Sequence, residues 1–358
     1  MFKLLDRYII RKFLGTYIFA IALLLAIVIM FDVNEKFDSF LKAPLRATIV
    51  DYFINFLPYF ANQFSPLFTF IAVIFFTTKL ADHNEIIAML SNGMSFRRLL
   101  RPYLFSAFVI AAATWVLGAY VIPPANVKRI DYTNTYVKNK RVDYGSNIML
   151  MVAPGEIAYM NRYDNITKSG SRFSLESFDS AKHLTSRLTA QRISWDTLYS
   201  WRVYDYVIRD FDDGREHITK GRSLDTVIPF EPRDFLIAKN DHEKMTTPAL
   251  AEYIESQRSR GVANIKSFEV EYQRRYAMTA AAFILTVIGM ALSSRKVKGG
   301  LGVNIGIGLV LSFSYILFMT VTQTFAISGM TSPLVAMWIP NVIYTVIAVV
   351  LYRRVSTQ

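Results

Sequence analysis

Residues 13–31 read FLGTYIFAIALLLAIVIMF, a run of 19 residues without a charge. A helix needs about 20 apolar residues to cross the hydrocarbon core of a bilayer. The run leads to no small-residue cleavage pattern, so we expect it to stay in the protein as a spanning helix. This stretch therefore predicts a membrane protein.

Further charge-free stretches of that size are Tyr52–Thr78, Pro102–Asn126, Tyr276–Ser294 and Gly299–Tyr352. The last is long enough for two helices, and the run from Gly329 to Pro333 favours a turn between them. We expect six transmembrane helices, three on each side of a polar stretch. Pro58 and Pro66 are expected to kink the second helix.

The composition agrees with a membrane protein, because 53% of residues are hydrophobic and only 19% are charged. The absence of cysteine excludes disulfides, thiolate catalysis and cysteine-ligated metals. The net charge of +12 lies largely in short segments beside apolar runs. Basic residues in such positions indicate how the chain is oriented in the membrane and where it contacts anionic lipid. No nucleic acid is therefore expected as a partner.

Lysines and arginines in short loops predict the orientation, because basic flanks resist translocation. One set of loops holds only Lys36, Lys42 and Arg46. The other set, with the chain ends, holds Lys3, Arg7, Arg11, Lys12, Lys79, Arg97, Arg98, Arg101, Arg295, Lys296, Lys298, Arg353 and Arg354. Both termini are therefore predicted to be cytoplasmic, and the long segment after the third helix to be extracytoplasmic.

That long segment changes to a two-residue period. Alternation runs from Asn147 to about Leu224, with hairpin turns predicted at 153–155 and 212–214. We expect six or more antiparallel strands in a small sandwich or roll. A helix should follow, starting near Pro248 and ending at Gly261, and a second helix at about 265–275 should lead into the fourth span.

These patterns divide the chain into three parts. Residues 1–130 should form the first three transmembrane helices, with a cytoplasmic helix near 82–92. Residues 131–246 should form a periplasmic β-rich domain. Residues 247–358 should form the connecting helices and transmembrane helices four to six.

Enzyme signatures are missing from the sequence. It contains no glycine-rich loop ending in Lys-Ser or Lys-Thr for binding ATP. Its four histidines, at 83, 183, 217 and 242, lack the close spacing of a metal site. We expect no enzyme activity, no cofactor and no metal.

The segment between the second and third spans reads DHNEIIAMLSNGMS at 82–95. Ile86, Met89 and Leu90 share one helical face, Gly93 follows as a stop, and the segment predicts a short amphipathic helix at the membrane surface. It could be a plain interfacial linker. It could also be a coupling helix that docks into a groove on a separate ATPase, with Glu85 facing a basic groove.

Four segments carry a specific resemblance, at 85–95, 271–275, 289–295 and 302–308. Over essentially its whole length the chain resembles the LptF/LptG (YjgP/YjgQ) permeases of lipopolysaccharide export, and its compact length favours the LptG-like member. The resemblance implies an ATPase-coupling role for Glu85, Ile86, Met89, Leu90 and Gly93.

The resemblance also implies a function and partners. The chain would be a permease subunit that pairs with a paralogous LptF-like permease and sits on a dimer of a cytoplasmic ABC ATPase, which hydrolyses the ATP. The complex would extract lipopolysaccharide from the outer leaflet of the inner membrane. A jelly-roll-like periplasmic domain, with an LptC-like bitopic protein, would pass the lipid to a periplasmic bridge. The first and fifth spans, Phe13–Phe31 and about Leu301–Ile327, would form lateral gates.

Two groups of residues agree with that implication. Lipid A carries phosphates, so cations are expected at the outer rim of its cavity, and the candidates are Lys36, Lys42, Arg46, Lys128 and Arg129. They could instead reach ordinary anionic lipids. Gly302, Gly306 and Gly308 allow close helix approach, which suits a gate and also a permanent dimer.

Two other functions remain open on the sequence. A non-transporting scaffold or sensor would bind a periplasmic partner and relay that state to an ATPase through the cytoplasmic helix. An ion-coupled carrier would work without an ATPase. The predicted spans contain no Asp, Glu, Lys, Arg or His, of which such carriers usually need one.

Overall fold

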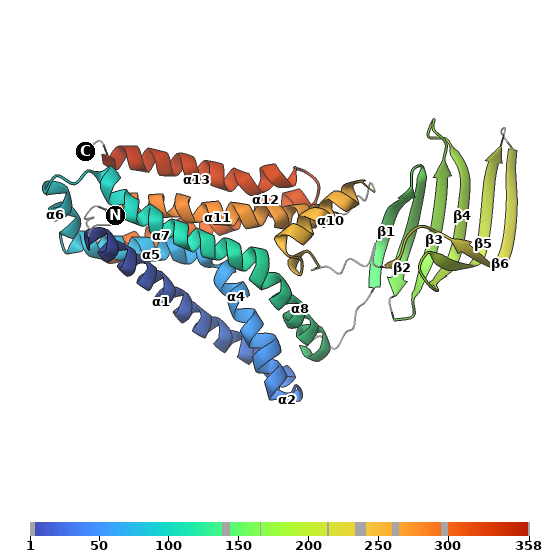
Figure 1. Ribbon diagram of the computed structural model, residues 1–358, viewed down its shortest axis with the longest axis horizontal. Coiled ribbons are helices and arrows are strands. Elements are labelled where there is room, and N and C mark those ends of the chain that lie inside the picture. The colour runs from blue at the N-terminus through green and yellow to red at the C-terminus, as the bar shows by residue number, and fades with distance from the viewer. Residues whose placement is uncertain are drawn as a thin grey trace. The chain divides into compact units, whose positions relative to one another are not determined.

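The computed structural model describes residues 4–137, 144–164, 166–212, 215–232, 241–259, 265–294 and 300–356. The chain divides into two compact units (Figure 1). The helical unit consists of Met1–Asn139, Glu243–Pro248 and Lys266–Gln358. The sheet unit consists of Lys140–His242 and Ala249–Ile265.

The α-helices are α1 (Leu4–Glu35), α2 (Phe37–Lys42), α3 (Leu45–Ala47), α4 (Ile54–Gln63), α5 (Ser65–Asp82), α6 (Glu85–Ser91), α7 (Phe96–Val116), α8 (Ile122–Tyr132), α10 (Thr247–Ser259), α11 (Lys266–Ser293), α12 (Gly300–Ile327) and α13 (Pro333–Ser356). Wider π-helical turns occur at η1 (Thr48–Phe53), η2 (Leu117–Val121) and η3 (Thr133–Val137), and a 3-10 turn at η4 (Asp241–Glu243).

Six helical segments among the described residues are long and apolar enough to cross a membrane, namely Leu4–Glu35, Ser65–Asp82, Phe96–Val137, Lys266–Ser293, Ile305–Ile327 and Pro333–Ser356. The predicted number of spans is confirmed. The predicted break between the last two is also confirmed, since α12 ends at Ile327 and Gly329 adopts a φ of 87°. The protein is a multi-pass membrane protein.

The second span differs in detail from the sequence prediction. Instead of one kinked helix, the structure has α4 and α5, separated at Phe64. Pro66 lies in the first turn of α5, where its missing N–H needs no partner. Proline therefore starts a helix here, and of the two prolines expected to kink the span, Pro58 is the one inside a helix.

The sheet unit contains six antiparallel strands, β1 (Tyr144–Ala153), β2 (Glu156–Asp164), β3 (Ser169–Phe178), β4 (Leu184–Trp195), β5 (Ser200–Asp212) and β6 (Arg215–Val227). This confirms the predicted β-rich insertion. The strands lie in sequence order in one sheet, each paired with the next (Figure 1). The described strands thus form a meander, without the long crossovers that a jelly-roll uses.

The alternation of the strands places large side chains in one core. Trp201, Tyr163 and Phe173 are almost fully buried, and Trp201 Nε1 donates a hydrogen bond to the Phe230 carbonyl at 3.0 Å. Phe230 follows β6, so the chain leaving the last strand covers part of this core. Burial of these aromatic side chains holds the unit together without any disulfide.

Local sequence signals fix several turns and helix ends. Gly155 adopts a φ of 80° between β1 and β2, as the predicted turn requires. Asp212 pairs with Arg215 at the hairpin between β5 and β6, while the predicted turn residues Asp213 and Gly214 lie outside the described residues. Gly261, the predicted helix end, lies outside them too. As predicted, the second connecting helix continues into the fourth span, as α11.

The centre of the helical unit is formed by α5 and α11. In the apolar spanning stretch of α5, 78% of the residues are buried. In that of α1, only 6% of the residues are buried. The backbone of α12 approaches α5 closely at Gly308, because a Cβ there would collide with the Ile74 side chain. The corresponding positions at Gly302 and Gly306 meet nothing within 4 Å.

We predict that Gly308→Val destabilises the purified chain, because the new side chain would collide with Ile74, which is 1% exposed and packed in the core. Overpacking of this kind costs about 1–3 kcal/mol. Unfolding in detergent micelles measures the change. Gly306→Val is the control and should leave unfolding unchanged; equal effects would contradict the assigned contact.

Candidate functional site

The linker between the second and third spans folds as α6, flanked by two residues in the left-handed region. Asn84 has a φ of 59° and separates α5 from α6, and Gly93 has a φ of 85° just after α6 ends. Ser95 then caps α7 by accepting the Arg98 backbone N–H at 3.3 Å. Because Asn84 and Gly93 break the helical conformation on either side, α6 is a separate two-turn helix.

One side of α6 packs inward. Ile86 is 1% exposed in a core cluster with Ile9 and Phe13 of α1, and Met89 packs against the same cluster. Leu90 is 38% exposed and thus lies at the edge of the buried face. Ile87, which the sequence analysis did not select, is 55% exposed on the outer side.

Polar contacts join α1 to the elements around α6. Tyr8 Oη donates a hydrogen bond to Glu85 Oε2 at 3.3 Å. The Asp6 carboxylate, 3% exposed, accepts from the Arg98 guanidinium at 2.7 Å. The start of α1, helix α6 and the start of α7 therefore form one connected end of the helical unit, which we call the α6 end; the end of α13 also lies there (Figure 1).

At the opposite end of α1, the predicted headgroup cation Lys36 is engaged within the chain. Its ammonium group pairs with Asp32 and donates to Tyr52 Oη at 2.6 Å, and Tyr52 also donates to Asp32 at 3.1 Å. Tyr52 is 1% exposed within an aromatic cluster that includes Phe56 and Tyr132. The Lys36 side chain remains 21% exposed.

The other predicted headgroup cations divide into two kinds. Lys42, Arg46 and Lys128 are exposed. Arg129 donates to Asn126 Oδ1 at 3.0 Å, pairs with Glu243 at 3.4 Å and stacks 4.3 Å from the centre of the Tyr59 ring. Position beside a span therefore does not distinguish a free cation from one held by the protein.

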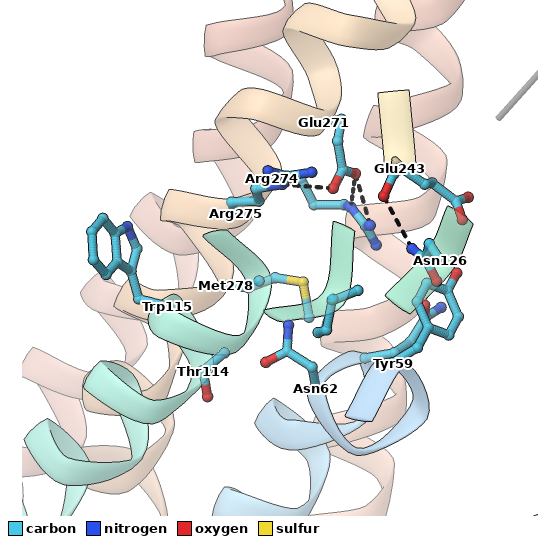
Figure 2. Close-up of a pocket in the computed structure, with 13 residues that line it drawn as sticks. Tyr59, Asn62, Thr114, Trp115, Asn126, Glu243, Glu271, Arg274, Arg275 and Met278 are labelled. Carbon is cyan, nitrogen blue, oxygen red and sulfur yellow. Dashed lines mark hydrogen bonds and ion pairs between the residues drawn. The ribbon is translucent and has the colours of Figure 1, made fainter. Parts of the chain in front are cut away.

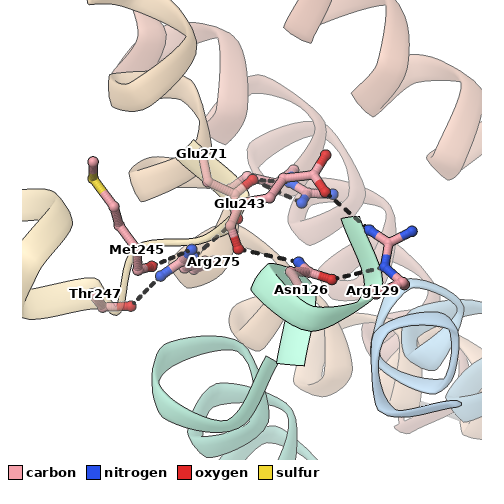
Figure 3. Close-up of polar contacts among 8 residues, drawn as sticks. Asn126, Arg129, Glu243, Met245, Thr247, Glu271 and Arg275 are labelled. Carbon is pink, nitrogen blue, oxygen red and sulfur yellow. Dashed lines mark hydrogen bonds and ion pairs between the residues drawn. The ribbon is translucent and has the colours of Figure 1, made fainter. Parts of the chain in front are cut away.

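Arg129 belongs to a larger polar cluster, shown in Figure 3, which we call the polar clamp. Its members are Asn126, Arg129, Glu243, Met245, Thr247, Glu271 and Arg275. The clamp joins α8 and α11 to residues 243–247, which precede and begin α10. It fixes the segment by which the chain re-enters the helical unit after the strands.

Arg275 is the central residue of the clamp. Its Nε donates to Glu271 Oε1 at 2.9 Å, one terminal nitrogen donates to Thr247 Oγ1 at 2.9 Å, and the other to the Met245 carbonyl at 3.0 Å. Arg275 is 9% exposed and Glu271 7%. A buried charge is tolerated when it is paired and hydrogen-bonded in this way.

A small cavity lies beside the clamp (Figure 2). Its volume is about 30 Å³, which is room for about two water molecules and far less than a lipid or nucleotide needs. Arg274 lines it and pairs with Glu271 at 2.7 Å, and Asn62 lines it with a buried, unpaired Oδ1. The cavity suits bridging water, so we assign it to the support of the clamp.

The part of the chain that the structure describes contains no candidate metal site. No group of three or more histidines and carboxylates is close enough to hold an ion there. The polar residues of the clamp bind one another, so they supply no open coordination position.

The helical unit, α6 and the clamp can now be compared with known proteins. A family model described as lipopolysaccharide export system permease LptF/LptG matches residues 7–354. The chain belongs to the LptF/LptG permease family. The match includes all six spans and the sheet, and it confirms the resemblance found in the sequence. A search of curated proteins gives no match.

The clamp was missed by sequence reasoning, although part of it was visible. The segment at 271–275 stood out only by its resemblance to the permease family. Its one available signal was a carboxylate four residues before an arginine at the start of an apolar helix, a spacing that favours an ion pair. Nothing in the sequence pointed to Glu243 or Asn126 as their neighbours.

We predict that Glu271→Gln destabilises the protein, because it leaves the buried Arg275 guanidinium without its counter-charge. Removing one partner of a buried pair costs about 3–5 kcal/mol. Unfolding in detergent micelles should show the loss. Glu255→Gln, at an exposed position of α10, should change stability by less than about 0.5 kcal/mol. Similar losses in both variants would refute a structural role for the clamp.

Proposed function

We propose that this chain is one permease subunit of an ATP-driven transporter that extracts lipopolysaccharide from the outer leaflet of the inner membrane. The extracted lipid would pass to a periplasmic bridge toward the outer membrane. The observation that carries the proposal is α6, a separate two-turn helix between two spans, anchored by Ile86 and linked to α1. Such a helix can receive force from a soluble ATPase.

The α6 surface supports an ATPase partner. Ile87 and Leu90 are exposed apolar residues, and helices commonly dock by placing such side chains in a groove. Ile86 and Met89 face inward and would keep α6 attached to the spans during docking, and Gly93 would let the chain turn away. Glu85 adds a charge that a basic groove would attract.

The exposed faces of α1 and α12 support a paired arrangement with a paralogous, LptF-like permease. Ile18 and Phe19 of α1 are 65% and 69% exposed, and Val310 and Leu317 of α12 are 69% and 64% exposed. Lipid or a second membrane chain can cover such faces. Gly302 and Gly306, open in the single chain, would then provide close approach at a lateral gate.

The remaining parts of the proposal concern lipid and location. Lys42, Arg46 and Lys128 offer exposed cations for lipid A phosphates, with Lys36 and Arg129 close by in bonded positions. The distribution of short-loop lysines and arginines supports an inner-membrane orientation with cytoplasmic termini and a periplasmic sheet unit. An LptC-like bitopic protein and a periplasmic bridge protein complete the proposed partners, and we assign the chain as LptG-like.

The decisive experiment is reconstitution of the native complex in proteoliposomes. Export predicts that lipopolysaccharide stimulates ATP hydrolysis and leaves the membrane for an added acceptor when ATP is present. A scaffold or sensor would bind the ATPase and show no ATP-dependent release of lipid. Release without an ATPase would support an ion-coupled carrier and contradict our proposal.

We predict that Glu85→Ala weakens ATPase association with the purified permease pair, because the charge facing the groove is lost. Losing one charge-assisted contact corresponds to about a tenfold or greater rise in Kd. Tyr8→Phe is the matched control, since it removes the internal partner of Glu85 and leaves the charge in place. Unchanged affinity in Glu85→Ala, or an equal loss in Tyr8→Phe, would contradict direct docking by Glu85.

We predict that replacing Lys42, Arg46 and Lys128 together by Gln lowers lipopolysaccharide copurification and its stimulation of ATP hydrolysis. These side chains are exposed, so the chain should still fold. Arg97→Gln, at an exposed cation of the α6 end, should leave lipopolysaccharide copurification unchanged. Retention of lipid by the triple variant at both low and high salt would exclude these residues from the headgroup site.

A further inference from the structure

A groove lies beside the contact between α1 and α5 in the helical unit. The two helices are closely packed there, because Phe13 of α1 shares a buried cluster with Phe76 and Leu80 of α5. The groove has a volume of about 580 Å³, which is in the range of ligand sites. Its lining consists of Phe75 from α5 and, from α1, Tyr8, Arg11, Lys12, Gly15, Thr16 and Phe19.

The character of the groove changes along α1. The six α1 residues are spaced by three or four positions or adjoin such positions, so they lie on one face of the helix. Arg11 and Lys12 directly precede the uncharged run that begins at Phe13. Farther along, Phe19 is 69% exposed and Phe75 38%. The groove therefore has a cationic part at the α6 end and an apolar part within the span.

The cations of the groove are available to a ligand. Arg11 and Lys12 are exposed, and neither forms an ion pair with a carboxylate of the described residues. Lys12 Nζ lies 5.9 Å from the centre of the Tyr8 ring. Lys79 of α5 is exposed four residues after Phe75, on the same helical face. It adds a third cation at the α6 end of the groove.

The apolar part of the groove is open. Gly15 is exposed, and a Cβ at this position would meet nothing within 4 Å. Any larger side chain here would therefore extend into the groove. The Thr16 hydroxyl donates to the Lys12 carbonyl at 2.8 Å, so its hydrogen bond is already made within α1.

This arrangement matches a phospholipid with a negatively charged headgroup. Arginine and lysine bind phosphate oxygens, and basic pockets between membrane helices bind anionic headgroups. The acyl chains would lie over Gly15, Phe19 and Phe75. Free phosphate would use only the cationic part of the groove. An apolar protein helix would cover Arg11 and Lys12 without supplying a counter-charge, which is costly.

We propose that the groove between α1 and α5 binds one anionic phospholipid from the leaflet at the α6 end, with its phosphate on Arg11 and Lys12. This is a defined site, in contrast to the diffuse attraction of basic residues to a membrane. It is also separate from the candidate lipid A cations. Lys36 follows the other end of α1, about 36 Å from Lys12 at the rise of a helix, and the hydrocarbon core is about 30 Å thick.

A lipid in this groove would contact both α1 and α5 close to α6. It would lie next to the hydrogen bond from Tyr8 to Glu85, which joins α1 to α6. The lipid would thus help to hold α1 against α5 at the α6 end. The inference does not depend on lipopolysaccharide export.

Native mass spectrometry of the full-length protein, purified in detergent and stripped of lipid, tests the site. The probes are phosphatidylglycerol, phosphatidylcholine with the same acyl chains, and inorganic phosphate. The first phosphatidylglycerol should bind several-fold more tightly than phosphatidylcholine. Equal affinity for the two lipids would overturn the proposal. Inorganic phosphate that binds as tightly as phosphatidylglycerol would overturn it too, because the site would then be one for a free anion.

A pair of double variants separates a site from general charge attraction. Arg11→Gln with Lys12→Gln should lower the affinity for phosphatidylglycerol to that for phosphatidylcholine. Arg97→Gln with Arg354→Gln removes two exposed cations of the α6 end that do not line the groove, and should leave the affinity unchanged. Equal losses in the two double variants would refute a defined site.

A third variant tests the apolar part without changing charge. Gly15→Leu fills the groove and meets no other atom of the chain, so the protein should fold and bind phosphatidylglycerol several-fold more weakly. Gly306→Leu, at an equally open glycine of α12, should bind it normally. Normal binding by Gly15→Leu would place the lipid elsewhere.

The same titration on the native complex tests what covers the groove. The high-affinity phosphatidylglycerol should remain bound when the partner chains are present. If the chain alone binds it and the complex does not, a partner chain occupies the groove and the proposal is wrong.

Discussion

A bilayer offers the backbone no hydrogen-bond partner, so each spanning segment of this chain must satisfy its own N–H and C=O groups as a helix. Charged side chains are costly in the same hydrocarbon, so the ion pairs named next lie at the ends of the helices. Asp6 and Arg98 pair where α1 and α7 begin, and Glu271 and Arg275 pair near the start of α11. Between these ends, the core around α5 and α11 is mainly apolar. The helical unit thus has an apolar middle and ion pairs at the ends of its helices.

The sequence predicted the structure best where a residue or run favours a single local structure. Uncharged runs located the spans, and Gly155 located a turn. It predicted less where a residue or pattern is compatible with two structures. Pro66 could kink a helix or begin one, and the choice depends on whether the preceding residues continue the helix; here they stop at Phe64. Strand periodicity likewise predicted pairing without fixing whether one sheet or two would form.

Prediction from sequence is limited in the same way at the candidate site. Ile86, Met89 and Leu90 share a face in the sequence pattern, but packing buries them to different degrees: Ile86 is 1% exposed, Met89 is partly buried and Leu90 is 38% exposed. Cations beside the spans look alike in sequence, yet only packing decides that Arg129 meets Glu243 while Lys128 stays exposed. Contacts between residues far apart in the chain leave no local pattern.

The sequential order of the six strands has a consequence for how the protein is made. Every strand pairs with the one synthesised just before it, from β1 through β6. Low separation between partners keeps the entropic cost of loop closure small and favours rapid formation of the sheet. Each hairpin can close as soon as its second strand has been synthesised. The core around Trp201 is completed after the strands, when Phe230 and then Ile265 arrive, so maturation of this unit follows the order of synthesis.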